Sequence, residues 1–351
     1  MIGGWARASG SVWTTIAGEG EMKDMRSFQY LRAPDLKTAV SLLGEPGTEV
    51  YAGGTDLLGE MKRKIRRVDR LVDLKGCGGI NQIEKQEGGG LKIGALASVE
   101  TVADHPGIKE GYPILSRAAS RVGTPQLRNM GTVGGNLCQH PRCWYFRHSQ
   151  FPCWLKGGEK CFAAQGRNHC HSILGLGVCH SVHASDLAPA LIALDARVGL
   201  TGPEGDREIP LEELYKKPEP LPRYATSLKA GELIRTIVIP AGPKGSRGFF
   251  LKAMERRAWS FALVSVSARF RLDGGRFVEG ALVLGGVAAI PWRAKEAEGV
   301  LIGKEYSESL AVQAADVALS AARPLRDNEY KIALAKGLIL QALQELAAED
   351  R

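Results

Sequence analysis

The stretch TEVYAGGTDLLGEMKRK, residues 48–64, changes its pattern within a few positions. Its first part is typical of a strand, and from Thr55 onward it predicts a helix. Gly53 and Gly54 stand between the two, where glycine permits positive φ and lets consecutive backbone amides converge on one anion. Thr55 or Asp56 can cap the helix, whose N-terminus favours negative charge. The stretch therefore predicts a strand–loop–helix unit whose loop is either a tight turn or an anion-binding loop.

A second loop of the same character, GTVGGN, occupies residues 131–136. Taken alone, each loop is more often a tight turn, because short glycine motifs commonly arise without a ligand. Neither loop matches G-x-G-x-x-G or the Walker sequence, which disfavours the Rossmann fold and the P-loop NTPases. Two such loops in one α/β region nevertheless suggest a pyrophosphate held from two sides, as a dinucleotide requires.

Two α/β units are predicted around these loops. The first covers residues 25–77, and its helix DLKTAVSLLG has Asp35 as N-cap and Gly44 as C-cap. The second covers residues 78–201 and is interrupted by a cysteine-rich insertion at about 138–180. It resumes with SDLAPALIALDARVGLTG, which predicts a helix followed by a strand.

The C-terminal part follows a different pattern. Residues 202–226, rich in Pro, Glu and Lys, predict a surface linker. The last unit, residues 227–351, contains several strands and a hairpin turn at Asp273-Gly274-Gly275, and it closes with two helices. Because its helices are grouped at the end, this unit is predicted to be an α+β domain.

The N-terminus and the overall composition exclude several classes of protein. Residues 1–24 lack a basic region followed by an apolar core, so they predict a flexible leader rather than a secretory signal, with Met22 or Met25 as alternative starts. The apolar stretch at 281–290 is shorter than the roughly 18 residues of a membrane span. The net charge of +8 is spread among 38 acidic residues without a base-reading motif, so no nucleic-acid partner is expected.

Cysteine and histidine are distributed unevenly along the chain. Six of the seven cysteines and six of the seven histidines lie between residues 138 and 183, and Cys77 lies apart from them. In a chain of 351 residues without a signal sequence, this clustering favours a metal site over a set of disulfides. The six clustered cysteines are Cys138, Cys143, Cys153, Cys161, Cys170 and Cys179.

The spacing of the cysteines is compatible with two kinds of metal site. Structural zinc normally uses two close cysteine pairs, and the ferredoxin spacing is absent as well. Four thiolates can still converge on a [4Fe–4S] cluster. Such a cluster carries negative charge, and five nearby basic residues would offset it. Zinc with His169, His171 or His183 as co-ligands is the competing interpretation, and the spacing modestly favours iron–sulfur. The basic residues are Arg142, Arg147, Lys156, Lys160 and Arg167.

Four ordered motifs carry a resemblance to a known family. They are AGGTDLL (52–58), QLRNMGTVGGNLCQ (126–139), HASDLAPALIALDA (183–196) and GELIRTIVIP (231–240) continued by FFLKAMERRAWSFALVSVSA. Over about residues 25–345 the chain resembles the FAD-binding subunit of molybdenum hydroxylases, the xanthine dehydrogenase and aldehyde oxidoreductase family. The resemblance implies an α+β chain with a vanillyl-alcohol-oxidase (PCMH)-type FAD-binding fold in two subdomains, followed by the family's C-terminal domain.

The resemblance also implies FAD-contacting residues, by matching of motifs. One wall of the FAD pyrophosphate site would consist of Ala52, Gly53, Gly54, Thr55, Asp56 and Leu57. The second wall would consist of Thr132, Gly134, Gly135 and Asn136. The positions that match further FAD contacts in relatives are Asp186, Ile234 and Lys252. No residue is assigned as a catalytic acid or base.

The cysteine-rich insertion is similar to that of a subgroup, the periplasmic-type aldehyde oxidoreductases and 4-hydroxybenzoyl-CoA reductases. Flavin subunits of this subgroup carry an extra [4Fe–4S] cluster. Matching implies four ligands and leaves Cys138 and Cys170 spare, with Cys170 as a competitor for the last place. The implied ligands are Cys143, Cys153, Cys161 and Cys179.

The chain offers no molybdopterin site and no second iron–sulfur motif. The resemblance therefore implies a heterotrimer with a molybdopterin-binding large subunit and a [2Fe–2S] small subunit. Electrons would pass from molybdenum through the [2Fe–2S] centres to FAD and then to an external acceptor. Aldehyde oxidation is favoured over reduction of a CoA ester. A cytoplasmic location is expected, with export on a partner subunit's signal as the alternative.

Two rival functions remain at this level. The first is a self-sufficient flavoprotein oxidase, which would need its own substrate pocket and catalytic base. The second is a non-enzymatic zinc-binding interaction module, which would hold neither flavin nor iron.

Overall fold

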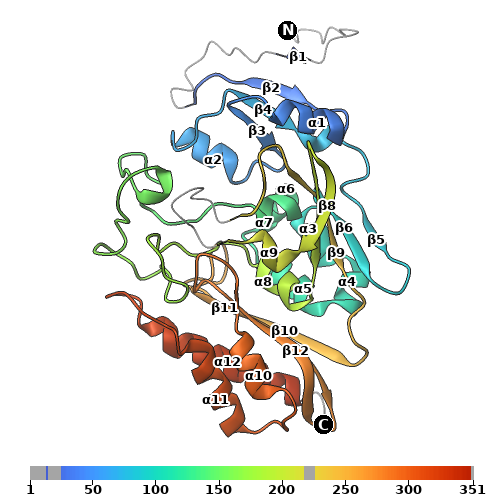
Figure 1. Cartoon of the computed structure of the whole chain (residues 1–351), viewed down its shortest axis with the longest axis vertical. Coiled ribbons are helices and arrows are strands. Elements are labelled where there is room, and N and C mark those ends of the chain that lie inside the picture. The colour runs from blue at the N-terminus through green and yellow to red at the C-terminus, as the bar shows by residue number, and fades with distance from the viewer. Residues whose placement is uncertain (1–12, 15–24, 217–225, 349–351) are drawn as a thin grey trace.

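The computed structural model describes residues 13–14, 25–216 and 226–348. Three sheets follow one another along its long axis, each with its own helices (Figure 1). Of the predicted leader, Trp13–Thr14 form β1, which pairs with β2, and the remaining leader residues lie outside the described residues. Among the described helices, none has the length and hydropathy needed to cross a bilayer.

The first unit is a four-stranded sheet in the order β1-β2-β4-β3, in which β2 and β3 both run parallel to β4. The Asp35 side chain caps α1 by accepting a hydrogen bond from the Thr38 amide at 2.7 Å, and Gly44 ends the helix, as predicted. The elements are β2 (Gln29–Arg32), α1 (Leu36–Leu43), β3 (Thr48–Tyr51), α2 (Leu57–Lys62), β4 (Arg70–Asp73) and η1 (Leu74–Gly76).

The second unit is an antiparallel five-stranded sheet in the order β5-β6-β9-β7-β8. Its strands are β5 (Ile83–Lys85), β6 (Leu91–Gly94), β7 (Arg197–Gly202), β8 (Gly205–Pro210) and β9 (Leu233–Ile239). Its helices are α3 (Val99–Asp104), α4 (Pro106–Gly111), α5 (Pro113–Ser120), α6 (Pro125–Met130), α7 (Val133–Leu137), α8 (Leu187–Ala193) and α9 (Leu211–Leu214). Helix α8 is fully buried and contributes to the largest apolar core.

Two segments of this unit differ from the sequence prediction. Residues 202–226 were predicted as a linker, but they contain β8, paired along its length with β7, and α9. Residues 233–239 were predicted within the C-terminal unit, but β9 lies between β6 and β7 in the second sheet. The local pattern identified β9 as a strand, but its pairing partners lie far away in the sequence, and periodicity carries no information about them.

The C-terminal unit is an antiparallel sheet in the order β10-β11-β12-β13, covered by three helices. The predicted hairpin is present, with Gly274 and Gly275 at φ +56° and +76° between β11 and β12. Helix α10 is an addition to the two predicted helices. The elements are β10 (Ser246–Ala253), β11 (Val264–Asp273), β12 (Arg276–Gly285), β13 (Trp292–Arg293), α10 (Lys295–Leu301), α11 (Glu308–Leu319) and α12 (Tyr330–Ala348).

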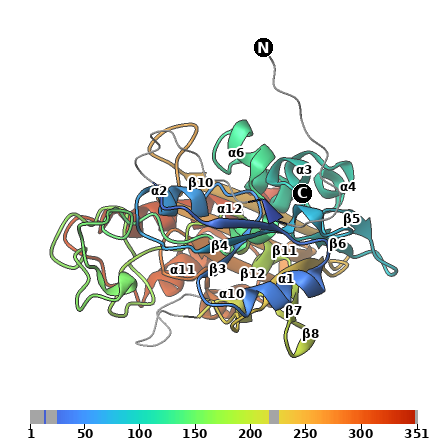
Figure 2. The same cartoon turned by 90° about the horizontal axis from the view of Figure 1, so that it is seen from above.

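Residues 139–184 form the cysteine-rich segment. Their loops lie to one side of the molecule, between the first unit and the C-terminal helices (Figures 1 and 2). Within them, the one regular element is a single 3₁₀ turn, η2 (Trp154–Lys156).

Candidate functional site

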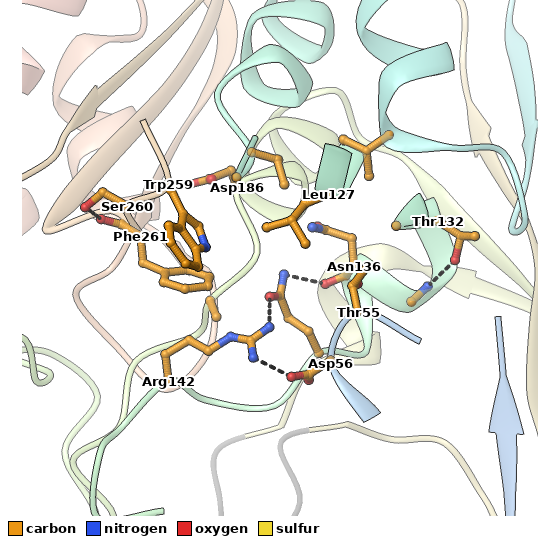
Figure 3. Close-up of a pocket in the computed structure, with 17 residues that line it drawn as sticks. Thr55, Asp56, Leu127, Thr132, Asn136, Arg142, Asp186, Trp259, Ser260 and Phe261 are labelled. Carbon is orange, nitrogen blue, oxygen red and sulfur yellow. Dashed lines mark hydrogen bonds and ion pairs between the residues drawn. The ribbon is translucent and has the colours of Figure 1, made fainter. Parts of the chain in front are cut away.

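A cleft of about 90 Å³, open to solvent, lies where all three units meet. Its walls come from the β3–α2 loop, the region of α6 and α7, the residues just before α8, and the loop between β10 and β11. Trp259 and Phe261 lie on one side of the cleft, and Leu127, Asn136 and Thr55 lie on the other (Figure 3).

The β3–α2 loop needs both of its glycines. Gly54 has φ +69°, in the region that favours glycine. A Cβ atom added to Gly53 would lie 1.9 Å from the carbonyl oxygen of Met130, so the first loop touches the end of α6 through its backbone. The two glycine loops predicted from the sequence therefore meet at one place.

The second loop is fixed by the β6–α3 connection. The amides of Val133 and Gly134 donate to the carbonyls of Ala97 and Ala95 at 2.9 and 2.8 Å. The Thr132 hydroxyl caps α7 by accepting a hydrogen bond from the Gly135 amide at 3.2 Å. These bonds lie entirely within the protein, so this wall of the cleft is preformed.

Six of the thirteen predicted FAD-contacting residues line the cleft, and the other seven do not. Five residues in or next to the two loops do not line the cleft: Ala52, Gly53, Gly54, Leu57 and Gly134. Lys252 does not line it either, but it donates a hydrogen bond to Asp186, which does. Ile234 lies elsewhere, buried in β9 opposite Leu200. The residues that line the cleft are Thr55, Asp56, Thr132, Gly135, Asn136 and Asp186.

Asp186 and Lys252 form a buried ion pair at the cleft. Their Oδ2 and Nζ atoms are 2.6 Å apart, and their side chains are 6% and 2% exposed. Lys252 Nζ also donates to the carbonyl of Arg121 at 3.0 Å. Burial raises the pKa of Asp186 above its usual value, and the charge of Lys252 opposes that rise. The pair therefore places a fixed positive charge and its counter-ion beside the space for a ligand.

The β10–β11 loop supplies cleft residues that the motif matching missed. Trp259 and Phe261 are 62% and 44% exposed, and both line the cleft together with Ser260. The Trp259 amide donates to the carbonyl of Gly123 at 3.3 Å, which anchors the loop on the opposite wall. Trp259, an aromatic residue in the polar connection between two predicted strands, was the available signal.

Of the two predicted caps, Thr55 or Asp56, it is Asp56 that stands at the N-cap position of α2, but its side chain makes no capping hydrogen bond. Its carboxylate instead accepts a hydrogen bond from the His140 amide at 2.9 Å and pairs with Arg142 and with Arg147, the latter at 2.8 Å. Burial alone would raise the pKa of Asp56, but the two guanidinium groups hold it below its usual value. These charges outcompete the helix amides for the carboxylate.

Glu60 on α2 extends this network into the molecule. Its side chain is 2% exposed and lies 3.0 Å from His140 Nδ1 and 3.1 Å from Arg147 Nη1. Arg147 further donates to the carbonyls of Pro141 and His140. Helix α2, which follows the first glycine loop, is therefore tied by ion pairs to the start of the cysteine-rich segment.

Side chains hold much of the cysteine-rich segment together. The Tyr145 hydroxyl accepts a hydrogen bond from the Arg167 amide at 2.8 Å, and its ring stacks on Phe162. Lys156 Nζ donates to the carbonyl of Tyr145 at 3.1 Å. All seven cysteines of the chain lie among the described residues, and all are free thiols rather than disulfides.

Among the four predicted cluster ligands, Cys143 interacts electrostatically with Cys161 and Cys179, and Cys179 with Cys153 and Cys161. Burial raises the pKa of Cys143 to about 12, and charges on Cys179 and Cys161 contribute to the rise. Burial also raises the pKa of Cys179, with contributions from Cys161 and Cys153. Backbone amides of the residues after Cys143 donate to its sulfur. Cys170 is influenced instead by charges outside this group.

The histidines proposed as zinc co-ligands are dispersed. His171 Nε2 lies 3.2 Å from Cys143 Sγ, and burial lowers its pKa to about 4. His183 packs edge-on against Tyr215, and burial lowers its pKa to about 4 as well. Cys138 packs against the largest apolar core. Neither His183 nor Cys138 is grouped with the four thiols.

Comparison with known families identifies the class of protein. Residues 26–242 match the FAD binding domain in molybdopterin dehydrogenase, and residues 249–346 match the CO dehydrogenase flavoprotein C-terminal domain. The chain therefore belongs to the FAD-binding subunits of the molybdenum hydroxylase family. It is an FAD-binding subunit of an oxidoreductase.

Individual relatives agree with this assignment. The chain is 37% identical to the aldehyde oxidoreductase FAD-binding subunit PaoB of Escherichia coli over 93% of its own length and 100% of the relative. It is 26% identical to the carbon monoxide dehydrogenase medium chain of Afipia carboxidovorans, over 93% of this chain and 98% of the relative.

The fold matches solved structures. A carbon monoxide dehydrogenase from Hydrogenophaga pseudoflava superimposes with a TM-score of 0.75 at 24% identity, covering 92% of this chain and 98% of the other. Quinoline 2-oxidoreductase from Pseudomonas putida gives a TM-score of 0.72 at 22% identity, covering 93% and 98%. The predicted fold class, an FAD-binding domain followed by an antiparallel-sheet domain, is confirmed.

Proposed function

We propose that this chain is the electron-transferring FAD subunit of a molybdenum-dependent, aldehyde-oxidising complex. The observation that carries the proposal is its 37% identity, over nearly its whole length, to an aldehyde oxidoreductase FAD-binding subunit. A molybdopterin-binding large subunit and a [2Fe–2S] small subunit would be its partners. Electrons from the [2Fe–2S] centres would reach FAD here and leave to an external acceptor.

FAD would occupy the cleft, with its pyrophosphate between the two glycine loops. Thr55, Asp56, Thr132, Gly135 and Asn136 line that space, and their backbone is held in place by bonds within the protein. Bound flavin supplies the electron-transfer chemistry, while the protein supplies position and electrostatics.

Two side chains would orient the flavin without taking part in proton transfer. Lys252 places a positive charge at the cleft, held by Asp186. Trp259 offers an apolar surface in the same cleft. No side chain is assigned as a general acid or base, because the substrate is oxidised at molybdenum in a partner subunit.

A [4Fe–4S] cluster held by Cys143, Cys153, Cys161 and Cys179 is the second part of the proposal. Four free thiols, one buried and three partly buried, with backbone amides donating to the Cys143 sulfur, fit such a cluster, since hydrogen bonds to sulfur tune its potential. The Cys170 sulfur lies within 4.8 Å of ligand atoms of His169 and Glu255 instead, which favours Cys179 as the fourth ligand. The cluster would relay electrons beside the flavin.

Iron and acid-labile sulfide counts on anaerobically purified variants test this ligand set. Serine at any of the four positions is expected to remove most of the iron, whereas Cys138→Ser and Cys170→Ser are expected to retain about four iron atoms per chain. Retention of all iron in Cys179→Ser would overturn the ligand set. FAD content, measured in the same samples, reports separately on the cleft.

The partner subunits are tested by purification of the tagged chain followed by mass spectrometry. Recovery of a molybdopterin-binding protein and a [2Fe–2S] protein is expected. Oxidation of an aldehyde by the chain alone would instead support a self-sufficient oxidase.

A further inference from the structure

A second group of possible metal ligands lies apart from the four clustered thiols. Among the described residues, His169, Cys170 and Glu255 bring an imidazole nitrogen, a thiol sulfur and a carboxylate oxygen within 4.8 Å of one another. His169 Nε2 lies 3.5 Å from Glu255 Oε1. None of the three residues has a role in the proposed function.

The backbone that carries two of these donors is held by the start of α12. Asn168 and Asp327 exchange hydrogen bonds, from the Asn168 amide to Oδ2 at 3.3 Å and from the Asp327 amide to Oδ1 at 2.9 Å. The Tyr330 hydroxyl donates to the carbonyl of His169 at 3.0 Å. The His169 ring also packs against Trp144, with ring centroids 5.1 Å apart. The imidazole is therefore oriented by contacts that do not use Nε2.

The backbone of Cys170 is held in a similar way, by the side chain of Lys331. Lys331 Nζ, on a fully buried side chain, donates to the carbonyl of Cys170 at 3.1 Å and to that of Gly286 at 2.8 Å. Burial raises the pKa of the Cys170 thiol, and the charge of Lys331 opposes that rise. A bound metal would hold Cys170 as the thiolate. The backbone positions of His169 and Cys170 are therefore fixed by contacts that do not require a metal.

The third donor belongs to a different element. Glu255 lies in the β10–β11 loop, residues 254–263, and its side chain is 58% exposed. The same loop carries Trp259 and Phe261, which line the flavin cleft. A metal ion bound by all three donors would therefore link the cysteine-rich segment to the loop that forms one wall of the cleft.

We propose that His169, Cys170 and Glu255 form a Zn²⁺ site that clamps the β10–β11 loop against the cysteine-rich segment. One imidazole, one thiolate and one carboxylate are ordinary zinc ligands, and water completes a tetrahedral set. Bond lengths of 2.0 to 2.3 Å put the ligand atoms of such a set about 3.3–3.8 Å apart. The separation of 3.5 Å between His169 and Glu255 already meets this requirement, and the exposed Glu255 side chain can close the remaining gap.

Zinc binding to the full chain, purified with its cofactors and freed of loose metal by a chelator, is the first test. Equilibrium dialysis with ZnCl₂ is expected to give one zinc per chain, lost in Cys170→Ser and His169→Gln. Glu255→Gln should weaken binding by about tenfold or more, since loss of groups that merely orient a ligand already costs that much. Glu159→Gln, which removes an exposed charge from the same segment, is the matched control and should bind zinc normally.

Iron is counted in the same samples, and this separates the zinc site from the iron–sulfur proposal. Full iron content in Cys170→Ser, together with loss of zinc, is the expected result. Loss of iron in this variant would make Cys170 a cluster ligand and would overturn the zinc site. Zinc bound equally by the wild type and Cys170→Ser would overturn it as well, leaving His169 and Glu255 as a simple ion pair.

The clamp is tested by limited trypsin digestion, because Arg256 and Arg257 are exposed on the loop. Zinc should slow cleavage there by about threefold or more, as expected when local opening is restricted. The Glu255→Gln variant should show no protection, although it retains the other two donors. Equal cleavage with and without zinc in the wild type would exclude the clamp.

Discussion

The walls of the flavin cleft are built largely from helices, strands and the short loops between them, whereas the cysteine-rich segment, residues 139–184, contains one 3₁₀ turn as its regular structure. At the Thr132 loop of the cleft, the amides of Val133 and Gly134 donate to backbone carbonyls of the same unit. In the segment, side chains such as Tyr145 and Lys156 satisfy backbone groups of distant residues.

This difference indicates how each region keeps its conformation when its cofactor is absent. The backbone of the cleft is preformed, so FAD would bind without rearranging it. The segment depends on specific side chains, and a cluster in the proposed site would contribute to its folding, as bound metals do in small metal-binding domains. Changes in the cleft should therefore affect flavin alone, while only the contacts between the two regions should affect both cofactors.

The largest effect is expected for Lys252→Met. It leaves the Asp186 carboxylate buried without its partner, and breaking such a pair destabilises a protein by about 3–5 kcal/mol. Urea unfolding measures the loss, and flavin content should fall while iron content stays unchanged. The double variant Lys252→Met/Asp186→Asn removes both charges and should recover much of the stability.

The pH dependence of Lys252→Met has a defined sign. Burial already raises the pKa of Asp186, and loss of Lys252 removes the charge that opposes the rise. A carboxyl whose pKa is higher in the folded state binds protons more tightly there, so stability falls as pH rises through that pKa. The deficit of the variant should therefore be smaller at about pH 5 than at about pH 7.5. An equal deficit at both values would contradict this account.

Gly53→Ala tests the contact between the two loops. The new Cβ would lie 1.9 Å from the backbone carbonyl oxygen of Met130, which should cost about 3 kcal/mol, the upper end for overpacking. The FAD-to-protein ratio should drop with iron retained. Gly59→Ala, a helical glycine in α2 whose added Cβ meets nothing within 4 Å, is the matched control and should bind FAD normally.

Glu60→Gln tests the link between the two regions. Loss of the buried charge weakens its contacts with His140 and Arg147, at a cost of about 2 kcal/mol for hydrogen bonds to a charged group. Unlike the cleft variants, it should lower both flavin and iron content. If iron remained complete while flavin fell, the two regions would be independent.

The smallest effect is expected for Thr132→Ala. It removes the side-chain cap of α7 and should cost about 1 kcal/mol. Thermal unfolding measures the change, and Thr132→Ser, which keeps the hydroxyl, should lie near the wild type. FAD affinity should fall slightly with no change in iron.

Features that depend on neighbours in the sequence were predictable. The Asp35 cap joins residues three positions apart, and the Gly274–Gly275 turn is determined by its own backbone. Matching of motifs likewise located both loops and Asp186 at the cleft.

Features that depend on tertiary pairing were not predictable. Asp56 bonds to Arg142, 86 residues away, and for that reason does not cap its helix. Trp259 enters the cleft only because β10 and β11 bring their loop to it. The place of β9 between β6 and β7 depends on pairing across the sequence in the same way.

The most direct test of the central claim is the ratio of iron, acid-labile sulfide and zinc to FAD in the chain purified anaerobically without partner subunits. The account predicts about four iron and four sulfide per FAD, with zinc confined to one further site. Flavin accompanied by zinc but by neither iron nor sulfide would contradict it.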